Sequence, residues 1–423
     1  MPAGRAAEPS SELYDTGLDG FYLGGAAAIV LSYVLEAPLR FGLNAIGLDF
    51  AIYLRDAMIV AYAGISVIAW GRSGRGAGPL AVTLAVLALH ALIGFVTLND
   101  ARQPLFGLKI FLPLVLGVVI GPLLHSRTRQ VERFAAGCFW ITAIGVLLNA
   151  FVEYPWTGMS FETAIGTREL SRKWWSAGEA RLAGFTRASY LAAQIMLASL
   201  VPLLAARPRW WLRVLLISIA VAVITLTTSK AAYIGLLALL LCSGLLFARG
   251  MTPLLVGFIA LLYFSCVALP IVCVQLDAPA RDVPSWAASF VERMLEMWPR
   301  AFALLDGPLS VVLGRGLGGI GSPQQLGEAY WYNTADNVML FLLVSFGIAG
   351  PIYVGIAAAR LAATLATGLL TRSLSWACSW IALLLAVGLT SQMIEDPISN
   401  LSLGVSLALL FQPAEPAYAP AYD

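Results

Sequence analysis

The sequence predicts an all-α polytopic membrane protein with about twelve transmembrane helices, and three observations support this prediction. The 423 residues are 59% hydrophobic and only 12% charged, whereas soluble domains contain roughly 25% charged residues. The mean hydropathy is +0.82 over the whole chain, which indicates many segments that need lipid. Apolar runs of about 20 residues, the length that crosses a bilayer core of ~30 Å, recur along the chain.

The apolar runs divide the chain into two tails and one membrane domain. Residues 1–19 are polar and lack the basic region and cleavage site of a signal peptide, so they are expected to form a cytoplasmic tail. Residues 20–412 form a single transmembrane domain, and 413–423 form a second cytoplasmic tail. The seventh and eighth runs are joined by "TTSKAAY" without a clear loop, so ten or eleven spans are alternatives. The expected spans are 20–37, 51–70, 79–98, 105–124, 134–152, 188–205, 211–228, 231–247, 254–275, 335–357, 374–392 and 397–412.

Short basic loops set the expected orientation. "GRSGRG", "HSRTRQVER" and "RPRWWLR" recur on one side, and positive charge in short loops marks the cytoplasm. Both termini are then inside, and two long loops, about 153–187 and 276–334, are periplasmic and are expected to contain amphipathic helices. Under this topology, 14 of the 26 lysines and arginines lie at the outer face. Snorkelling can explain any one of them, but an anionic ligand at the outer face explains the set better.

The second long loop contains a predicted amphipathic helix. "SWAASFVERMLEMWPRAFALLDG" places apolar residues at the i, i+3, i+4, i+7 spacing of one helical face. Pro299 predicts a kink or two short helices. Arg293 and Arg300 share the opposite face, and Glu296 lies between them, within reach of either. The alternative is an ordinary solvated face with ion pairs.

A polar cluster at residues 333–337, "NTADN", precedes the tenth expected span. An aspartate at a membrane mouth is costly unless it is paired or functional. Partial desolvation tends to raise the pKa of a carboxyl group towards the range of a general base, whereas a nearby arginine lowers it. Asp336 is therefore a candidate base. The alternative is a helix start, capped by Thr334 or Asn333, in which Asp336 favours the helix dipole.

"GRGLGGIGS", residues 314–322, matches a dinucleotide-binding fingerprint twice. That fingerprint requires a strand before the glycines and a helix after them. Here an amphipathic helix precedes and the loop "SPQQLGEAYWYN" follows, so the match is rejected. The glycines are expected to form a flexible or tightly turning hinge between the Arg293–Arg300 helix and the Asp336 mouth, and Arg315 adds a cation there.

Cysteine and histidine are too few, and wrongly placed, for a disulfide framework or a metal site. The five cysteines lie in apolar runs and the two histidines are far apart in the sequence. No metal ligands, no cofactor and no nucleic-acid partner are therefore expected.

The order of four motifs resembles the O-antigen polymerase and O-antigen ligase superfamily of bacterial membrane glycosyltransferases. They are "RLAGF" (181–185), "TTSKAAY" (227–233), "ERMLEMWPRAFALLDGPLSVVLGRGLGG" (292–319) and "ADNVMLFLLVSFGIAG" (335–350). The resemblance covers about 170 residues. The chain departs from the family pattern at Ser229-Lys230, where the family has Ser-Arg, and at Asp336-Asn337, where it has His-Asn. Ligases in the family hold the histidine more strictly, so Asp336 favours a polymerase.

The resemblance implies a GT-C-like fold in the bacterial inner membrane, with an active site that faces the periplasm. The donor would be a glycan on an undecaprenyl pyrophosphate carrier, and the acceptor a sugar hydroxyl on a second carrier-linked repeat unit. A chain-length regulator protein is a further partner that the family suggests. Asp336 would deprotonate or orient the acceptor hydroxyl, and Arg293 would act with it on the reacting groups. The expected pyrophosphate- and substrate-binding residues are Arg181, Lys230, Arg300, Arg315, Arg102, Lys109 and Asn337.

Two alternatives remain open. A ligase would transfer the glycan to a lipid A core instead of to a second repeat unit. A transporter or flippase of lipid-linked sugars belongs to a different class, and it should place charges near mid-membrane in broken helices. The sequence instead concentrates its charges at the outer face and in the two long loops.

Overall fold

The fold of the chain is an almost wholly helical bundle in a computed structural model that describes residues 16–73, 78–163, 166–176, 179–248, 250–275, 287–367 and 371–411. The helices of the first half are α1 (Thr16–Val34), α2 (Glu36–Ala45), η1 (Asp49–Tyr53), α3 (Leu54–Ser73), α4 (Gly78–Thr97), α5 (Arg102–Ile110), α6 (Leu112–Leu124), α7 (Thr128–Asn149) and α8 (Ser189–Ala205). Those of the second half are α9 (Trp210–Thr227), α10 (Lys230–Phe247), α11 (Thr252–Val274), α12 (Ala288–Glu292), the π-helical turn η2 (Arg293–Met297), α13 (Trp298–Phe302), α14 (Pro308–Leu313), α15 (Gln324–Gly327), η3 (Ala329–Trp331), α16 (Val338–Phe346), α17 (Ala349–Ala366), α18 (Arg372–Gly388) and α19 (Pro397–Phe411).

Every expected span contains a helix, so the prediction of a polytopic helical membrane protein is confirmed. Eight helices of the described chain are long and apolar enough to cross a membrane, or nine if α1 and α2, bent by 87°, form one span. Three shorter apolar helices, α8, α18 and α19, are largely buried inside the bundle. The number of crossings stays a prediction. α1 already begins at Thr16, four residues earlier than expected, and the rest of both predicted tails lies outside the described residues.

The tenth expected span, 335–357, is wrong as a single helix. It is split into α16 and α17 at Gly347, whose φ of +62° lies in the left-handed region that ends a helix. A β-carbon at Gly347 would overlap the backbone of Val312, and one at Gly350 would overlap that of Leu342. The chain therefore turns sharply, because small residues let other backbone segments approach the break.

The first long loop contains β-hairpins where amphipathic helices were expected. Strand β1 (Ser160–Thr163) pairs antiparallel with β2 (Gly166–Glu169), with Ser160 opposite Glu169. Strand β3 (Trp174–Ser176) pairs with β4 (Glu179–Arg181), with Trp174 opposite Arg181. Aromatic and β-branched residues in short runs favour strands over helices, and no apolar helical period competes with them in this loop.

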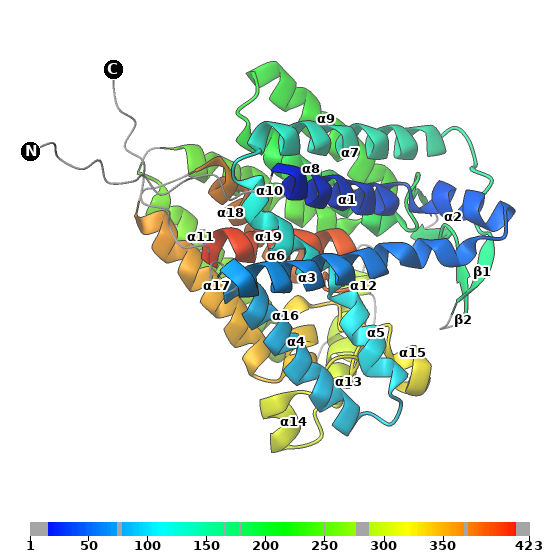
Figure 1. The fold of residues 1–423 in the computed structure, drawn as a ribbon. Coiled ribbons are helices and arrows are strands. Elements are labelled where there is room, and N and C mark those ends of the chain that lie inside the picture. Colours follow the sequence, from blue (N-terminus) through cyan, green and yellow to red (C-terminus); the bar gives the residue numbers. More distant parts are fainter. Residues whose placement is uncertain are drawn as a thin grey trace, which may run out of the picture.

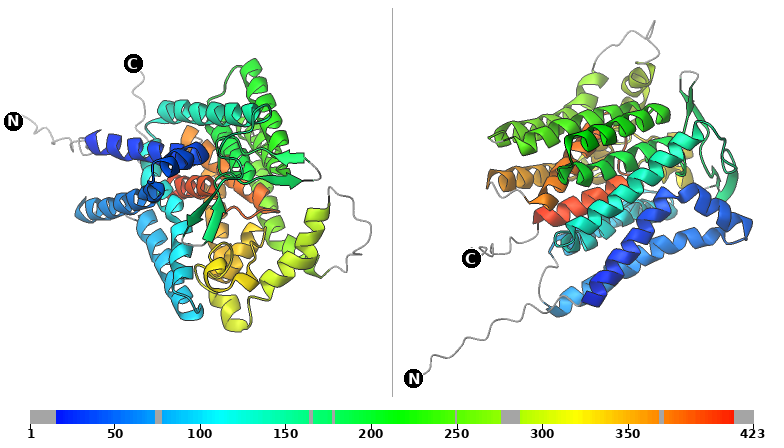
Figure 2. Two further views of the ribbon diagram at one scale, coloured as in Figure 1. Left: turned by 90° about the vertical axis from the view of Figure 1, so that its right-hand side faces the viewer. Right: turned by 90° about the horizontal axis from the view of Figure 1, so that it is seen from above.

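The bundle has two distinct ends. α1 begins and α19 ends at one of them, and α2 and the β-hairpins lie at the opposite end (Figures 1 and 2). We call these the terminal end and the loop end. The centre is built on α6 and α19, where Gly117 and Gly404 let the two backbones approach closely.

The glycine-rich segment 314–321 is packed tightly at the loop end. Gly316 has a φ of +79°, and a β-carbon on it would overlap the backbone of Gly94 in α4. A β-carbon on Gly318 would likewise overlap the backbone of Gln103 in α5, and Leu317 is fully buried. Two forms were expected for this segment, a flexible hinge and a tight turn. The close backbone contacts of its glycines fit the tight turn.

Candidate functional site

The candidate site forms where the helix 288–302 meets the start of α16 at the loop end. Arg293 Nη2 lies 2.8 Å from Asp336 Oδ2, and the two side chains are 20% and 24% exposed. Both groups are therefore partly desolvated and still reachable from outside. Arg293 Nη1 also donates to the carbonyl of Ser289 at 2.6 Å, while its buried Nε has no hydrogen-bond partner. The guanidinium carries five N–H donors, so Nη1 and Nη2 keep donors beyond these two contacts that a ligand oxygen could use.

Pro299 explains the shape of the helix that carries Arg293. Proline lacks an N–H and its ring clashes with the carbonyl four residues earlier. The chain adopts a π-helical turn at η2, between the five-residue helices α12 and α13. Two short α-helices are thus present, as one of the two expected forms predicted, and η2 joins them without an interruption of the helical chain. Trp298 is fully buried and anchors the turn, and Glu296 forms no ion pair with any described residue.

Asp336 has an unusual backbone conformation. Ala335 and Asp336 have φ values of +62° and +43°, two consecutive non-glycine residues in the left-handed region. Such residues cost roughly 1–3 kcal/mol each and tend to occur at functional sites. Asn333 stabilises the turn, because its Oδ1 accepts the Ala335 N–H at 2.7 Å. Thr334 donates its hydroxyl to Asp336 Oδ1 at 2.9 Å, which holds the carboxylate toward Arg293.

Asn337 has a structural role in the helix start. Its Oδ1 accepts the Leu340 N–H at 2.9 Å, so Asn337 is the N-cap of α16. Its Nδ2 donates to the carbonyls of Cys266 and Leu389, and the residue is fully buried. The expected caps, Thr334 and Asn333, are therefore wrong. Asn337 was also expected to bind substrate, but its amide donors are already used by the backbone of α11 and the α18–α19 turn.

Arg181 lies close to Arg293. Burial and the charge of the Arg293 guanidinium both lower the pKa of Arg181. Arg181 ends β4, and the next N–H, that of Leu182, bonds the Leu226 carbonyl near the end of α9 at 3.1 Å. That bond brings the α9–α10 turn beside Arg181. Lys230 follows the turn as the exposed first residue of α10. Arg181 and Arg293 thus place two positive charges close together, an arrangement that attracts an anion.

Four other expected cations lie elsewhere. Arg315 Nη1 and Nη2 bond the Glu328 carboxylate at 3.0 and 2.7 Å, and Nη1 also bonds the Gly319 carbonyl. Arg315 therefore fixes the glycine-rich segment instead of facing a ligand. Arg102 is paired with Asp100, and Lys109 lies 3.1 Å from Asp56. Arg300 is exposed on α13 and forms no ion pair in the described chain.

Sequence reasoning missed a buried ion network beside this site. Glu36 is 2% exposed, and its Oε1 forms ion pairs with Arg40 Nη2 at 2.8 Å and with Arg55 Nη2 at 3.6 Å. Burial opposes the charge of Arg187, but the Glu36 carboxylate and the Tyr190 hydroxyl raise its pKa overall. One signal was available, since Glu36 is a carboxylate inside an expected apolar span, where charges are rare without partners.

Glu395, whose charge acts on Arg187 of this network, connects it to the glycine-rich segment. Its carboxylate accepts the backbone N–H of Ser322 and, at 2.7 Å, the Ser322 hydroxyl. The neighbouring Gly321 N–H bonds the Asn333 carbonyl at 2.9 Å, three residues before Asp336. The network thus supports the segment that positions Asp336.

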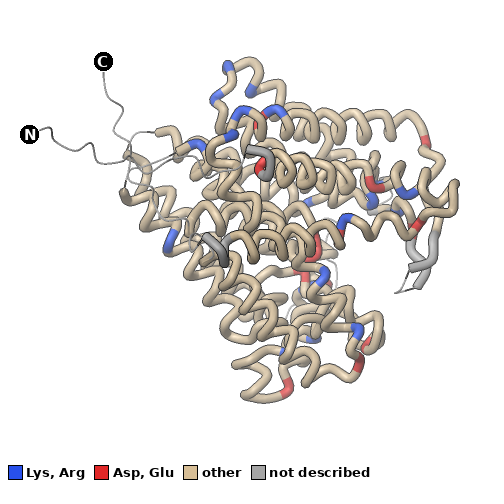
Figure 3. Tube along the Cα trace, in the orientation of Figure 1, with Lys and Arg blue, Asp and Glu red and all other residues tan. Residues whose placement is uncertain are grey.

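Figure 3 shows charged positions gathered toward the ends of the bundle, with most of the acids at the loop end.

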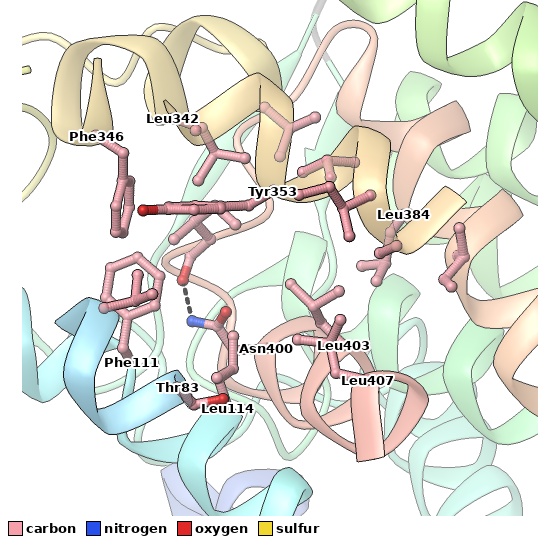
Figure 4. Close-up of a pocket in the computed structure, with 18 of the residues that line it drawn as sticks. Thr83, Phe111, Leu114, Leu342, Phe346, Tyr353, Leu384, Asn400, Leu403 and Leu407 are labelled. Carbon is pink, nitrogen blue, oxygen red and sulfur yellow. Dashed lines mark hydrogen bonds between the residues drawn. The ribbon is translucent and has the colours of Figure 1, made fainter. Parts of the chain in front are cut away.

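An apolar groove of about 580 Å³ opens between α4, α6, α16, α17, α18 and α19. Val338 and Met339, which directly follow the Asp336 turn, line it, and Gly78 and Phe411 line it towards the terminal end. Aromatic and leucine side chains face one another across it, and the amide of Asn400 is held at its wall by a backbone carbonyl (Figure 4). No Asp, Glu, Lys or Arg occurs among the described lining residues. Such a groove suits a hydrocarbon chain.

The described part of the chain contains no group of three or more His, Cys, Asp or Glu side chains placed to hold a metal ion. The chain matches no known family model, and no curated protein shows significant sequence similarity to it.

Proposed function

We propose that this protein is a polysaccharide polymerase of the bacterial inner membrane. It transfers a glycan from an undecaprenyl pyrophosphate carrier to a sugar hydroxyl of a second lipid-linked repeat unit at the periplasmic face. The observation that most supports this proposal is the Arg293–Asp336 pair, held in a strained turn at the loop end with Arg181 beside it. A base and two cations in one accessible place match the needs of this reaction.

The reaction breaks the anomeric C–O bond and leaves a lipid pyrophosphate, whose negative charge must be stabilised. Fixed guanidinium groups in a partly desolvated site stabilise developing charge well, because they need no reorganisation when it appears. Arg181 and Arg293 supply them, and Lys230, after the α9–α10 turn beside Arg181, adds positive charge near the site. Arg300 contributes from the exposed surface of α13. Arg315, Arg102 and Lys109 contribute only to the surrounding field, since each is already paired.

Asp336 accepts the proton of the acceptor hydroxyl or orients that hydroxyl for attack. In the resting protein Arg293 holds the carboxylate at 2.8 Å. A bound pyrophosphate competes for the same guanidinium, so donor binding loosens the pair and exposes Asp336 to the acceptor. Direct displacement by the hydroxyl would invert the anomeric centre. No step requires a divalent metal.

The apolar groove is the proposed binding place of the polyprenyl tail. It begins at Val338, two residues after Asp336, so a chain in the groove would leave its pyrophosphate head at the candidate site. The groove also bears on the transporter alternative. A pathway for a charged sugar needs polar groups at mid-membrane, whereas the helix break at Gly347 and the described groove lining contain no charged residue.

Replacing either member of the pair tests the proposal. Arg293→Ala and Asp336→Ala should be produced and inserted normally but should fail to extend the surface glycan, because a positioned base typically contributes roughly 100- to 10,000-fold. Lys173→Ala is the matched control, since Lys173 is a half-exposed cation of the first loop paired with Glu153. Chain length is read from the extracted polysaccharide. Wild-type length in either site variant removes that residue from the mechanism.

A further inference from the structure

Helix α14 exposes an apolar surface within a loop that the sequence places in water. Leu309 is 71% exposed, Val312 is 53% exposed and Leu313 is 41% exposed, and the six residues of α14 include no charge. Exposure of such an apolar surface to water is unfavourable, so lipid or another apolar partner is expected to cover it. The contacts of α14 show its depth relative to the neighbouring helices, and this depth favours lipid.

The first set of contacts places α14 below the membrane surface. The Ile348 N–H bonds the Val311 carbonyl at 3.0 Å, so α14 lies level with the break between α16 and α17. Further along α17, Arg360 Nε bonds the Leu410 carbonyl, next to the last residue of α19 at the terminal end. At 1.5 Å per residue, Ile348 lies roughly 18 Å from that level, inside a hydrocarbon core of about 30 Å.

A second set of contacts gives the depth from the other side. Thr97, the last residue of α4, donates its hydroxyl to the Arg315 carbonyl at 2.6 Å. The same hydroxyl bonds the Ile93 carbonyl at 3.0 Å, so the Arg315 carbonyl lies at the last turn of α4. The Leu317 N–H bonds the His90 carbonyl at 2.9 Å, three residues before Ile93. The segment after α14 therefore descends about one turn, roughly 5 Å, along α4 from the loop end.

We propose that residues 308–317 re-enter the membrane from the loop end and that acyl chains of the outer leaflet cover the exposed face of α14. The surface around α14 supports lipid as the occupant. Leu92 of α4 and Ile352 of α17 are 63% and 49% exposed, and both helices are long and apolar enough to cross a membrane. The face of α14 continues this lipid-facing surface.

The charges of the segment fit this environment. Arg315 is the one charged residue between 308 and 317, and both of its terminal nitrogens bond the Glu328 carboxylate. Ionisable groups at membrane depth are tolerated when they are paired in this way. Asp306, which is exposed, precedes α14 and lies where the chain returns to the head groups. This proposal does not depend on the transferase activity.

The collision of a nitroxide with oxygen or with a water-soluble nickel chelate tests the proposal. The full-length protein is placed in lipid nanodiscs with a spin label at Leu309→Cys, at Leu92→Cys as the lipid reference and at Glu153→Cys as the water reference. Glu153 is a suitable match because its side chain is 67% exposed, close to the exposure of Leu309. The five native cysteines are buried, so the label reports the introduced residue.

The oxygen-to-nickel ratio at residue 309 should match the ratio at 92 and exceed the ratio at 153 several-fold. A ratio at 309 equal to that at 153 overturns the proposal and places α14 in water. Val312→Cys repeats the measurement if the label at 309 prevents purification, and the same two outcomes decide.

Discussion

The neighbours of Asp336 determine both its backbone conformation and the position of its carboxylate. It stands between a left-handed alanine and the asparagine that caps α16, so its carboxylate is free of any capping role. Thr334 and Arg293 each hold one of its oxygens. A helix start needs no such arrangement, because Asn337 caps α16 through the Leu340 N–H without a contribution from Asp336. The strained turn is therefore better explained by what Asp336 does than by how α16 begins.

A second aspartate gives a prediction of pH dependence. Asp396 is 2% exposed, precedes α19, and accepts bonds from the Ile398 and Ser399 N–H groups and from the Ser399 hydroxyl. Burial raises its pKa from 3.8 to about 6, against the effect of these bonds. The folded protein thus holds a proton that the unfolded chain releases between about pH 4 and pH 6. The free energy of unfolding should fall as the pH rises through that window and level off above it.

The expected size of this effect is roughly 3 kcal/mol, because each pH unit of difference in pKa corresponds to about 1.4 kcal/mol. Asp396→Asn keeps the shape and an acceptor but cannot titrate, so its stability should vary less between pH 4.5 and pH 7. Thermal unfolding of the two proteins at several pH values measures the difference. Parallel pH profiles would show that Asp396 does not titrate in this range.

The sequence predicted three of the residues that meet at the site, Arg181, Arg293 and Asp336. It could do so because each belongs to a short motif with a recognisable order. It could not predict that Arg315 pairs with Glu328, or that Glu395 supports Ser322, since these partners are chosen by contacts between distant segments. Charge type can be read from the sequence, but the partner of each charge depends on the packed structure.

At the scale of elements, hydropathy predicted where helices run but not where they break. The split between α16 and α17 depends on the close approach of the Val312 backbone to Gly347, which has no side chain in the way. This contact with a distant segment is not visible in any local sequence pattern. The hairpins of the first loop were missed for a different reason. Strand propensity decides the local structure of this loop, because no 3.6-residue apolar period favours a helix there.

The packing of the glycine-rich segment can be tested by one methyl group. Gly316→Ala puts a β-carbon into the backbone of Gly94 and holds an alanine at a φ of +79°. Left-handed strain and overpacking together should lower the free energy of unfolding by roughly 2–5 kcal/mol.

Gly64→Ala is the control, because Gly64 lies in helix α3 with open space around its α-carbon and should gain up to about 1 kcal/mol. Thermal unfolding in detergent compares the two variants. Equal midpoints for both would contradict the tight backbone contact at Gly316.

At the scale of the whole molecule, the loop end brings together four segments that are far apart in the chain. The β4 end, the α9–α10 turn, the helix 288–302 and the start of α16 meet near one partly exposed ion pair, and Val338 at the start of α16 lines the apolar groove. A deletion strain separates the two transferase alternatives. Loss of a polymerase leaves single repeat units attached to lipid or released, which is the expected result. Full-length chains stranded on the carrier would instead identify a ligase.

The most direct test of the central claim is glycan transfer by the purified protein in a lipid bilayer, with a polyprenyl pyrophosphate-linked repeat unit as both donor and acceptor. The account predicts products of more than one repeat unit, release of polyprenyl pyrophosphate, and loss of both with Arg293→Ala and with Asp336→Ala. Movement of the intact substrate across the bilayer without longer products, or undiminished transfer by both variants, would contradict it.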